Sequence, residues 1–449
     1  PPEMRSRRLS ADRSGFDVFG SRGQSVNTSA IQNYVLLSRV RDAVRATNTT
    51  SCLSGTAGCV PINIFGAAGS LGSAEAIDYL TDDATTVVST SLSQVRGTLN
   101  GDVGVTSPFA GEPIGFAVGA EYRDYGAPQR SDALAKAAGE LGGAGGAAPD
   151  ITGGYNVYEG FAEVIAPLVS DRPGFNELTL EAGIRRSSYA VDAPGNPKFK
   201  TTTWKVAGSW EPISDIKFRG NYQRSVRAPN IGELFSPVTT GLTNLGTDPC
   251  AGNAPVVNAN LRAICIAQGA PAAVIGTITN PTAGQANVTG GGNPFVLPEK
   301  ARTWTVGAVL RPSFLRNFSA TVDYYKVKIT DAISSPTPQD LIAACFGATP
   351  TSPPASAAGS TACTIIRRNP VSGALDGPPD TTFGLFSPLS NLGRISTDGV
   401  DVTANYRIAL GQLMGVPARL NFSFGGNWTR SSKFQATPSA VNRECTGYY

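Results

Sequence analysis

The chain has 449 residues, of which 41% are hydrophobic, 8% aromatic and 16% charged, and its net charge is +3. This length can hold two or three ordinary domains or one very large β-structure, and the positive charge is not concentrated as nucleic-acid binding requires. No run of about 18 apolar residues is present, which excludes helical membrane spans. Histidine is absent, so Ser-His-Asp catalysis, Cys-His catalysis and H-E-x-x-H zinc sites are excluded.

Residues 1–85 have the least regular pattern. The chain opens with Pro1-Pro2-Glu3-Met4 and lacks the apolar core of a signal peptide, so we expect its beginning to be missing. A strand is only partly present around 14–28, and Ile31–Val44 fits a short amphipathic helix. We therefore predict a mostly irregular loop region with a partial strand.

From residue 86 onward, apolar and polar residues alternate with the period of two that is typical of half-apolar β-strands. Near residue 220, for example, Phe218 and Tyr222 fall on one face, and Lys217 and Arg219 fall on the other. Similar runs predict about ten strands, at 86–101, 112–125, 155–168, 177–190, 200–211, 216–228, 300–311, 317–330, 395–408 and 418–431.

The connections between these strands alternate strictly between short and long. The short ones lie at about 102–111, 169–176, 212–215, 312–316 and 409–417. The long ones are low in sequence complexity and lie at 126–154, 229–299 and 331–394, with 191–199 as a short member of that set. Transmembrane β-barrels show this alternation, with tight periplasmic turns at one end and long extracellular loops at the other.

Aromatic side chains favour a barrel over a soluble β-sandwich, which is the alternative fold. A sandwich predicts short strands with turns of mixed length and aromatic residues in mid-strand, whereas membrane barrels carry aromatic girdles near strand ends. The aromatic residues near predicted strand ends are Tyr122, Trp204, Trp210, Trp304 and Trp428. The predicted fold is therefore an all-β, antiparallel transmembrane β-barrel over 86–449, and residues 1–85 become a mostly extracellular loop region.

Six of the seven cysteines form three near-neighbour pairs inside Gly-, Pro-, Ser- and Thr-rich stretches. Short pairs in loops suggest disulfides formed in an oxidising compartment, and scattered free thiols are the alternative. The candidate disulfides are Cys52–Cys59, Cys250–Cys265 and Cys345–Cys363. Cys445 stands alone, and we expect its partner to lie downstream of this sequence. No C-x-x-C spacing occurs, and no metal site is predicted.

The carboxylates on the polar strand faces are predicted to line a water-filled lumen rather than to form a catalytic pair. They are Glu121, Glu163, Glu181, Asp323 and Asp401. No Gly-Lys dipeptide occurs, so there is no P-loop, and the glycine cluster at 142–146 lacks the context of a dinucleotide-binding motif. We predict neither enzymatic activity nor a cofactor.

One stretch is more specific than any other. Residues 222–237 form a strand that runs into an Arg-Ala-Pro-Asn corner, where proline ends the ladder because it has no N–H. This stretch closely resembles the barrel signature of TonB-dependent outer-membrane receptors. Four further segments resemble the family's barrel in the family's order, at 115–123, 293–301, 322–333 and 399–402. The residues that carry the family motif are Arg227, Ala228, Pro229, Asn230, Glu233, Leu234, Pro298 and Glu299.

The resemblance implies a plugged barrel of about 22 strands, of which about ten would lie in this chain. Nothing in the sequence resembles the family's plug domain, its TonB-binding box or its C-terminal aromatic strand, so we expect an internal part of the barrel. The implied function is TonB-dependent import of a scarce nutrient across the bacterial outer membrane. The implied partners are TonB, acting through the box and plug, outer-membrane lipid and a small nutrient ligand, with no nucleic acid.

The resemblance also implies that ligand-binding residues lie on the lumen wall and rim. The candidates are Lys217, Arg219, Asn221, Gln223, Arg227, Glu233, Asp323, Tyr325, Asp401 and Asn405. Arg227 and Glu233 suit an ion pair near the rim, either in a purely structural corner or in contact with substrate. The cysteine-stapled loops favour an oligosaccharide or other plant-derived nutrient, with a ferric siderophore as the competing ligand. A passive porin and a secreted β-rich adhesin or lectin-like binding protein are the alternative functions.

Overall fold

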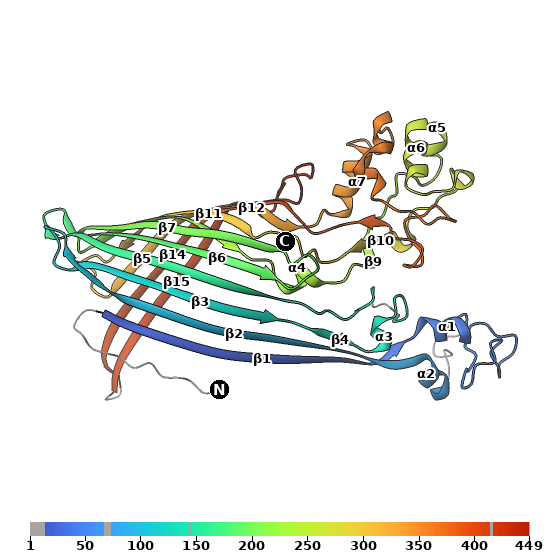
Figure 1. The fold of residues 1–449 in the computed structure, drawn as a ribbon, viewed down its shortest axis with the longest axis horizontal. Helices are drawn as coiled ribbons and strands as arrows, with labels where there is room; N and C mark the ends of the chain where they lie inside the picture. Colours follow the sequence, from blue (N-terminus) through green and yellow to red (C-terminus); the bar gives the residue numbers. More distant parts are fainter. Residues whose placement is uncertain (1–13, 67–72, 143–145, 414–415, 449) are drawn as a thin grey trace.

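The computed structural model describes residues 14–66, 73–142, 146–413 and 416–448. Its main feature is a 13-stranded antiparallel sheet whose long strands run side by side (Figure 1). A separate three-stranded sheet and the helices lie at one end of these strands. Within the described residues, no helix is both long enough and apolar enough to cross a membrane.

The strands of the large sheet follow one another in sequence order, each antiparallel to its neighbour. They are β1 (Ser14–Val35), β2 (Thr81–Thr106), β3 (Pro113–Gly126), β5 (Gly154–Arg172), β6 (Phe175–Val191), β7 (Lys198–Ile213), β8 (Ile216–Arg227), β11 (Glu299–Leu310), β12 (Phe318–Ser334), β14 (Ser390–Leu413), β15 (Val416–Gln435) and β16 (Arg443–Glu444), while β4 (Gln129–Ser131) pairs with β2 off this path. All ten predicted strands are present, and the predicted all-β antiparallel fold is confirmed.

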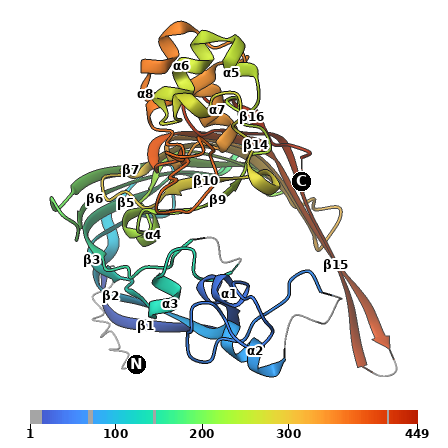
Figure 2. The same ribbon diagram turned by 90° about the vertical axis from the view of Figure 1, so that its right-hand side faces the viewer.

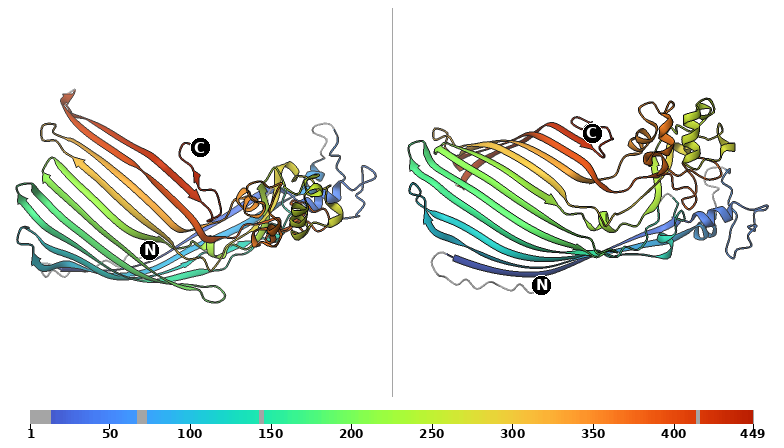
Figure 3. Two further views of the ribbon diagram at one scale, coloured as in Figure 1. Left: turned by 90° about the horizontal axis from the view of Figure 1, so that it is seen from above. Right: turned by 45° about the horizontal axis from the view of Figure 1, so that its top comes forward.

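The large sheet curves but does not close. Figure 2 looks along the strands and places β1 and β15 at opposite ends of the curve. Figure 3 shows that neighbouring strands keep a common tilt across the sheet. Tilted antiparallel strands with this curvature have the geometry of a barrel wall. The described strands therefore form an arc of a barrel.

The connections divide the molecule into a turn end and a loop end. The turn end has short connections, such as 173–174 between β5 and β6 and 214–215 between β7 and β8. The loop-end connections are 36–80, 127–153, 192–197, 228–298 and 335–389. The predicted alternation of short and long connections is confirmed, and 192–197 is the short member of its set.

The N-terminal region is more regular than predicted. The strand expected only in part at 14–28 runs through Val35 as β1 and pairs with β2 along nearly its whole length. The helix predicted over 31–44 is limited to α1 (Leu37–Ala43), because the preceding residues continue β1. Glycine and serine weaken the alternation in β1, so its conformation depends on the ladder with β2 rather than on its own pattern.

The convex face of the sheet is apolar and exposed. Successive side chains of a strand point to opposite faces, and the apolar set of β7, β8 and β11 faces away from the interior of the curve. Val206, Phe218 and Val306 illustrate this set, with exposures of 54%, 41% and 59%. An apolar surface that continues across many strands marks an interaction with apolar material. In a barrel wall this material is lipid.

Two long loop-end connections fold together into one compact body, here called the loop-end unit (239–290 and 337–386). Figures 1 and 2 show it beyond the ends of the long strands. Its elements are β9 (Thr239–Asn244), α5 (Ala254–Val257), α6 (Ala259–Ala267), β10 (Gln285–Gly290), α7 (Pro338–Phe346), α8 (Thr361–Thr364) and β13 (Leu385–Phe386). These segments, predicted only as low-complexity loops, share a hydrophobic core that includes Leu261, Ile264, Phe346 and Leu375.

An ion pair lies inside this core. Arg368 donates to both carboxylate oxygens of Asp248, at 2.6 and 2.8 Å, and its Nε donates to the side-chain oxygen of Gln268 at 2.7 Å. The side chains of Arg368 and Asp248 are both 0% exposed. Because Asp248 belongs to the first connection and Arg368 to the second, the pair ties the two loops together.

The structure joins the same three cysteine pairs that the sequence predicts. Cys250–Cys265 and Cys345–Cys363 lie in the core of the loop-end unit. Cys52–Cys59 closes a short loop in a separate lobe, here called the N-terminal lobe (36–66 and 73–80), which contains α1 and α2 (Ala74–Leu80). Cys445 is exposed and unpaired within the described residues. Each long connection that carries a disulfide is therefore part of a folded body rather than an open loop.

Candidate functional site

The Arg-Ala-Pro-Asn corner ends β8 and starts α4 (Ile231–Phe235) at the loop end. The side-chain oxygen of Asn230 accepts the Glu233 amide at 2.8 Å, and the Glu233 carboxylate accepts the Asn230 amide at 2.8 Å. This reciprocal capping box satisfies two N–H groups that a helix start otherwise leaves unpaired. Pro229 is buried beside it. The motif therefore turns the chain from the strand directly into a helix.

Arg227 is the charged centre of this corner. It donates to both oxygens of Glu233 at 2.9 Å and to both oxygens of Glu299 at 2.7 and 2.8 Å. Glu299, the register partner of Arg227 on β11, also accepts the Ile333 amide at 2.8 Å. Glu299 follows the buried Pro298 of the motif, which restricts the start of this strand. Four of the five N–H donors of Arg227 are used, which favours a structural corner over a substrate contact.

The helix α4 packs against the concave, inner face of the sheet. Figure 2 places it inside the curve. Leu234 of α4 is 2% exposed and shares a small core with Val191 and Val296, against which Tyr155 and Phe199 also pack. The corner thus seals an apolar patch on the inner face, just below the loop end.

Below this patch, ion pairs span the inner face across glycine residues. On β8, β11 and β12, Arg219, Gly307 and Asp323 lie opposite one another in register. Arg219 donates to Asp323 across the middle strand, with Nε at 2.8 Å from the carboxylate. A Cβ atom at Gly307 would lie 2.0 Å from that carboxylate oxygen. The glycine therefore leaves the space through which the ion pair passes.

The same arrangement recurs on the three neighbouring strands. Glu163, Gly183 and Lys205 lie in register on β5, β6 and β7, and the Lys205 amine is 3.6 Å from the Glu163 carboxylate. Glu181 is 3.9 Å from the same amine. These carboxylates, predicted to line a lumen, lie on the inner face and are paired with cations.

The remaining candidates are spread along the wall rather than gathered in one site. Lys217 pairs with Glu177 at 2.9 Å near the turn end. Asn427, which the sequence analysis did not single out, donates to Asp401 at 2.7 Å and to the Tyr325 hydroxyl at 3.2 Å. Asn405 lies farther toward the turn end on β14. Lys217 and Arg227 are about 33 Å apart along β8 at the usual strand rise.

Two amide residues of β8 have side chains that are open to further contacts. Asn221 has a buried side-chain oxygen with no hydrogen-bond partner among the described residues. Gln223 lies opposite Lys205 and lines a hollow of about 160 Å³ on the inner face. Arg185 and Glu163 line the same hollow. Gln223 is therefore accessible to a small polar ligand, and Asn405 lines a separate hollow of about 420 Å³ nearer the turn end.

A larger charged cluster on β3, β5 and β6 was not predicted as a site. Glu159 is 6% exposed, and its carboxylate accepts from Arg123, from Arg185 at 3.2 Å and from the Ser187 hydroxyl at 2.5 Å. The guanidinium of Arg185 also lies 4.9 Å from the ring centre of Phe161. Alternation places each of these side chains on the inner face, but only the register between strands shows that they meet.

The Arg219–Asp323 ion pair gives a direct test of the glycine arrangement. We expect Gly307→Val to lower the free energy of unfolding by about 1–3 kcal/mol, because the new side chain overlaps Asp323 and displaces it from Arg219. Gly425→Val is the matched control, since nothing lies within 4 Å of a Cβ at Gly425. Urea unfolding of the purified protein measures both values, and equal effects of the two substitutions would contradict the interpretation.

Arg227 gives a second test. We expect Arg227→Met to destabilise the corner by about 2–4 kcal/mol, because it leaves Glu299, whose side chain is 9% exposed, without its cation. The rate of amide hydrogen exchange should rise in α4 and in the first residues of β11. Arg316→Met, at an exposed turn-end residue, is the control. Unchanged exchange in α4 would show that the capping box alone holds the corner.

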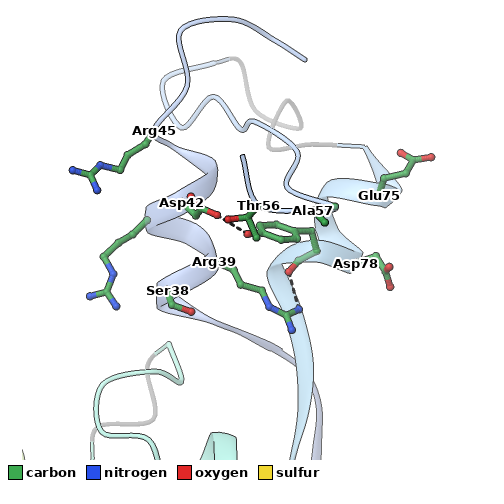
Figure 4. A pocket seen from close by; sticks show the side chains of 11 residues that line it. Ser38, Arg39, Asp42, Arg45, Thr56, Ala57, Glu75 and Asp78 are labelled. Atoms are coloured by element: carbon green, nitrogen blue, oxygen red, sulfur yellow. Dashed lines mark hydrogen bonds between the residues drawn. The ribbon is translucent and has the colours of Figure 1, made fainter. Parts of the chain in front are cut away.

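The N-terminal lobe contains a cavity of about 910 Å³ (Figure 4). Its lining includes Arg39, Asp42 and Arg45 of the α1 segment and Tyr79 of α2. The Tyr79 hydroxyl donates to Asp42 at 2.8 Å, and Arg39 donates to the Tyr79 carbonyl at 2.9 Å. The cavity is therefore a polar opening between two short helices that are held together by hydrogen bonds.

The lobe should loosen in acid. Hydrogen bonds from Ser54, Tyr79 and Thr56 lower the pKa of the Asp42 carboxyl below its usual value. A lowered folded-state pKa gives stability that is present above the unfolded value of about 3.9 and is lost as the pH falls through the folded value. We expect Asp42→Asn to flatten the pH dependence of hydrogen exchange in the lobe between about pH 5 and pH 2.5. Arg41→Gln, on the same cavity, should retain the wild-type dependence, because a guanidinium stays charged throughout this pH range.

No group of three or more His, Cys, Asp or Glu residues in the described ranges is arranged to hold a metal ion. The inner face instead offers ion-paired side chains, amides and hydroxyls. Such a wall can bind polar ligands through hydrogen bonds.

Among solved structures, the chain is similar to the ferric enterobactin receptor PfeA of Pseudomonas aeruginosa (a double mutant), with 12% identity, a TM-score of 0.49, and coverage of 96% of this chain and 46% of that chain. It is also similar to the copper transporter OprC, with 10% identity, a TM-score of 0.43, and coverage of 94% of this chain and 47% of that chain. The RagAB peptide transporter shares 12% identity with it at a TM-score of 0.46, with coverage of 95% of this chain and 35% of that chain. The chain thus spans less than half the length of these structures.

No curated protein matches the chain. The family model described as "TonB dependent receptor-like, beta-barrel" matches residues 8–444. This range includes the Arg-Ala-Pro-Asn corner and the strands of the large sheet. Because the match covers nearly the whole sequence, the chain belongs to the TonB-dependent receptor family and supplies part of its β-barrel.

Proposed function

We propose that the chain forms part of the wall of an outer-membrane importer that takes up a scarce nutrient when TonB supplies energy. The observation that carries this proposal is the family match over residues 8–444, in a sheet with an apolar convex face and an ion-paired polar inner face. The first face suits contact with lipid and the second suits a hydrated passage. TonB would act through the plug and the box of the whole receptor.

The ligand class stays a prediction, with an oligosaccharide first and a ferric siderophore next. One feature of the inner face supports an uncharged polar ligand. Lys205, Arg219 and Arg227 each face a carboxylate, so these cations are neutralised and offer little attraction for an anionic chelate. Gln223 and the hollow beside it offer an amide to hydroxyl groups.

Uptake in a deletion strain tests both levels of the proposal. A strain that lacks the full-length gene should lose uptake of one labelled ligand class, tested with oligosaccharides and ferric siderophores. A strain that lacks TonB should lose the same uptake. Uptake that survives without TonB and follows only the concentration gradient would indicate a passive porin. A wild-type protein that is recovered in the medium without detergent would indicate a secreted adhesin.

The variant Gln223→Ala tests whether the hollow on the inner face belongs to the ligand-binding site. We expect it to weaken ligand binding by about three- to tenfold, as loss of one hydrogen bond to a polar ligand predicts. Thr321→Ala, on the same face near the turn end, is the control. Equal affinities of the two variants would remove the hollow from the binding site.

A further inference from the structure

The convex face changes character abruptly near the loop end. Toward the turn end its rows are apolar: Phe218, Ala308, Val322 and Val402 lie side by side on β8, β11, β12 and β14. Toward the loop end, basic side chains replace them. We call this set the basic belt, and its members are Arg186, Lys200, Arg224, Arg302, Lys326, Lys328 and Lys433.

The centre of the basic belt is a row of cations in direct register. Arg224 of β8 lies opposite Arg302 of β11, and Arg302 lies opposite Lys328 of β12. Lys328 lies opposite Ser396 of β14, which lies opposite Lys433 of β15. Four cations therefore share one line across five adjacent strands, with about 4.8 Å between strands.

This row is unfavourable unless an anion is present. Like charges directly opposite one another destabilise a sheet. The nearest carboxylates on this face are already engaged, since Asp331 pairs with Lys300 and Asp398 pairs with Arg430. Lys326 of the basic belt lies opposite Asp398 in register, but among the described residues no ion pair involves the four cations of the row, Arg224, Arg302, Lys328 and Lys433. An anion from outside the described residues would balance this row.

The distance of the row from the turn end of the strands indicates its depth in the membrane. Arg224 lies eight residues after the first residue of β8, and Lys328 lies ten residues after the first residue of β12. A tilted strand crosses the hydrocarbon core in about 9–11 residues. The row therefore lies at the membrane surface nearest the loop end, directly beyond the aromatic pair of Tyr222 and Trp304, whose ring centres are 4.1 Å apart.

We propose that the basic belt binds the phosphate groups of lipid headgroups in the leaflet at the loop end. Phosphates are the anions that a membrane surface presents at this depth, and arginine forks match them in bidentate geometry. Cations that only extend toward water need no common register, whereas a row that spans about 19 Å between Arg224 and Lys433 can contact several phosphate groups at once. This inference rests on the membrane placement in the proposed function.

The test uses the full-length receptor in detergent micelles and diphosphoryl lipid A as the probe, with phosphatidylcholine as the neutral lipid. Native mass spectrometry and a titration give the retained lipid and its Kd. We expect the triple variant Arg224→Gln, Arg302→Gln and Lys328→Gln to bind lipid A roughly 100-fold more weakly, because each surface cation contributes about fivefold. Raised salt should weaken wild-type binding as well.

The matched control removes three exposed cations at the turn end, by Arg172→Gln, Arg311→Gln and Arg316→Gln. It should bind lipid A as the wild type does. A charge-retaining variant, Arg302→Lys with Lys328→Arg, should stay within about threefold. If the triple variant does not fold, the single variant Arg302→Gln tests the proposal instead. Its affinity for lipid A should fall about fivefold.

Equal affinity of the basic-belt and turn-end variants would overturn the proposal. So would wild-type binding that phosphatidylcholine matches, or binding that inorganic phosphate alone displaces completely at millimolar concentration, because the site would then be a phosphate site without lipid. Failure of the wild-type receptor to insert into bilayers is a different result, since it would contradict the membrane placement and hence the proposed function.

Discussion

Replacing Arg368 with methionine should unfold the loop-end unit while the large sheet stays folded. The side chains of Arg368 and Asp248 are fully buried and make two hydrogen bonds to each other, with a third from Arg368 to Gln268. Removing the cation leaves a buried carboxylate without compensation, a change that costs about 3–5 kcal/mol. That is a large share of the stability of a body of this size.

Hydrogen exchange and limited proteolysis of the full-length receptor measure this effect. Protection should fall across 239–290 and 337–386 and remain in β8 and β11. Arg367→Met, at the exposed neighbouring residue, is the matched control. The double change Asp248→Leu with Arg368→Met should recover much of the protection, because it removes both charges together. Protection that survives the single Arg368→Met change would mean that the two loops hold together without the ion pair.

The second large effect is expected from the buried disulfides. Each closes a loop of similar length, with separations of 15 residues for Cys250–Cys265 and 18 for Cys345–Cys363. Cross-links of this length stabilise by about 3 kcal/mol in the chain-entropy account. Replacing all four cysteines with serine should therefore unfold the loop-end unit at moderate temperature. Replacing either pair alone should lower the midpoint temperature at which this unit unfolds.

The same exchange experiment in reducing buffer checks this expectation without substitutions. Cys52→Ser with Cys59→Ser is the control, because that disulfide belongs to the N-terminal lobe and closes only 7 residues. It should leave protection in the loop-end unit unchanged. A loop-end unit that keeps its full protection after reduction would show that its hydrophobic core suffices.

The sequence predicts the sheet well because alternation is a local signal. Phe218 and Tyr222 on one face, with Lys217 and Arg219 on the other, are sufficient to predict β8 and its two faces. Arg227 and Glu233 are close in sequence, so their pairing was also predictable. Glu299 was recognised through the motif, but its place beside Arg227 depends on the register of β11.

Other features depend on contacts between residues far apart in the chain. Asp248 and Arg368 lie 120 residues apart, and nothing near either residue indicates a buried partner. The segments around them are rich in small residues, and each supplies only part of a core, so composition alone predicts open loops. Glu159 is a similar case, since its cluster with Arg123 and Arg185 forms only when three strands are aligned.

The shared core of the loop-end unit also constrains the order in which the protein can assemble. Its first half precedes β11 and its second half follows β12, so the core cannot be completed until both strands have been synthesised and paired. Closure of contacts at such long sequence separation is slow because the chain entropy is lost before the contacts form. During this interval the first half exposes the apolar side chains that later join this core. The intermediate in which the first half is present without the second is therefore the stage at which aggregation is expected.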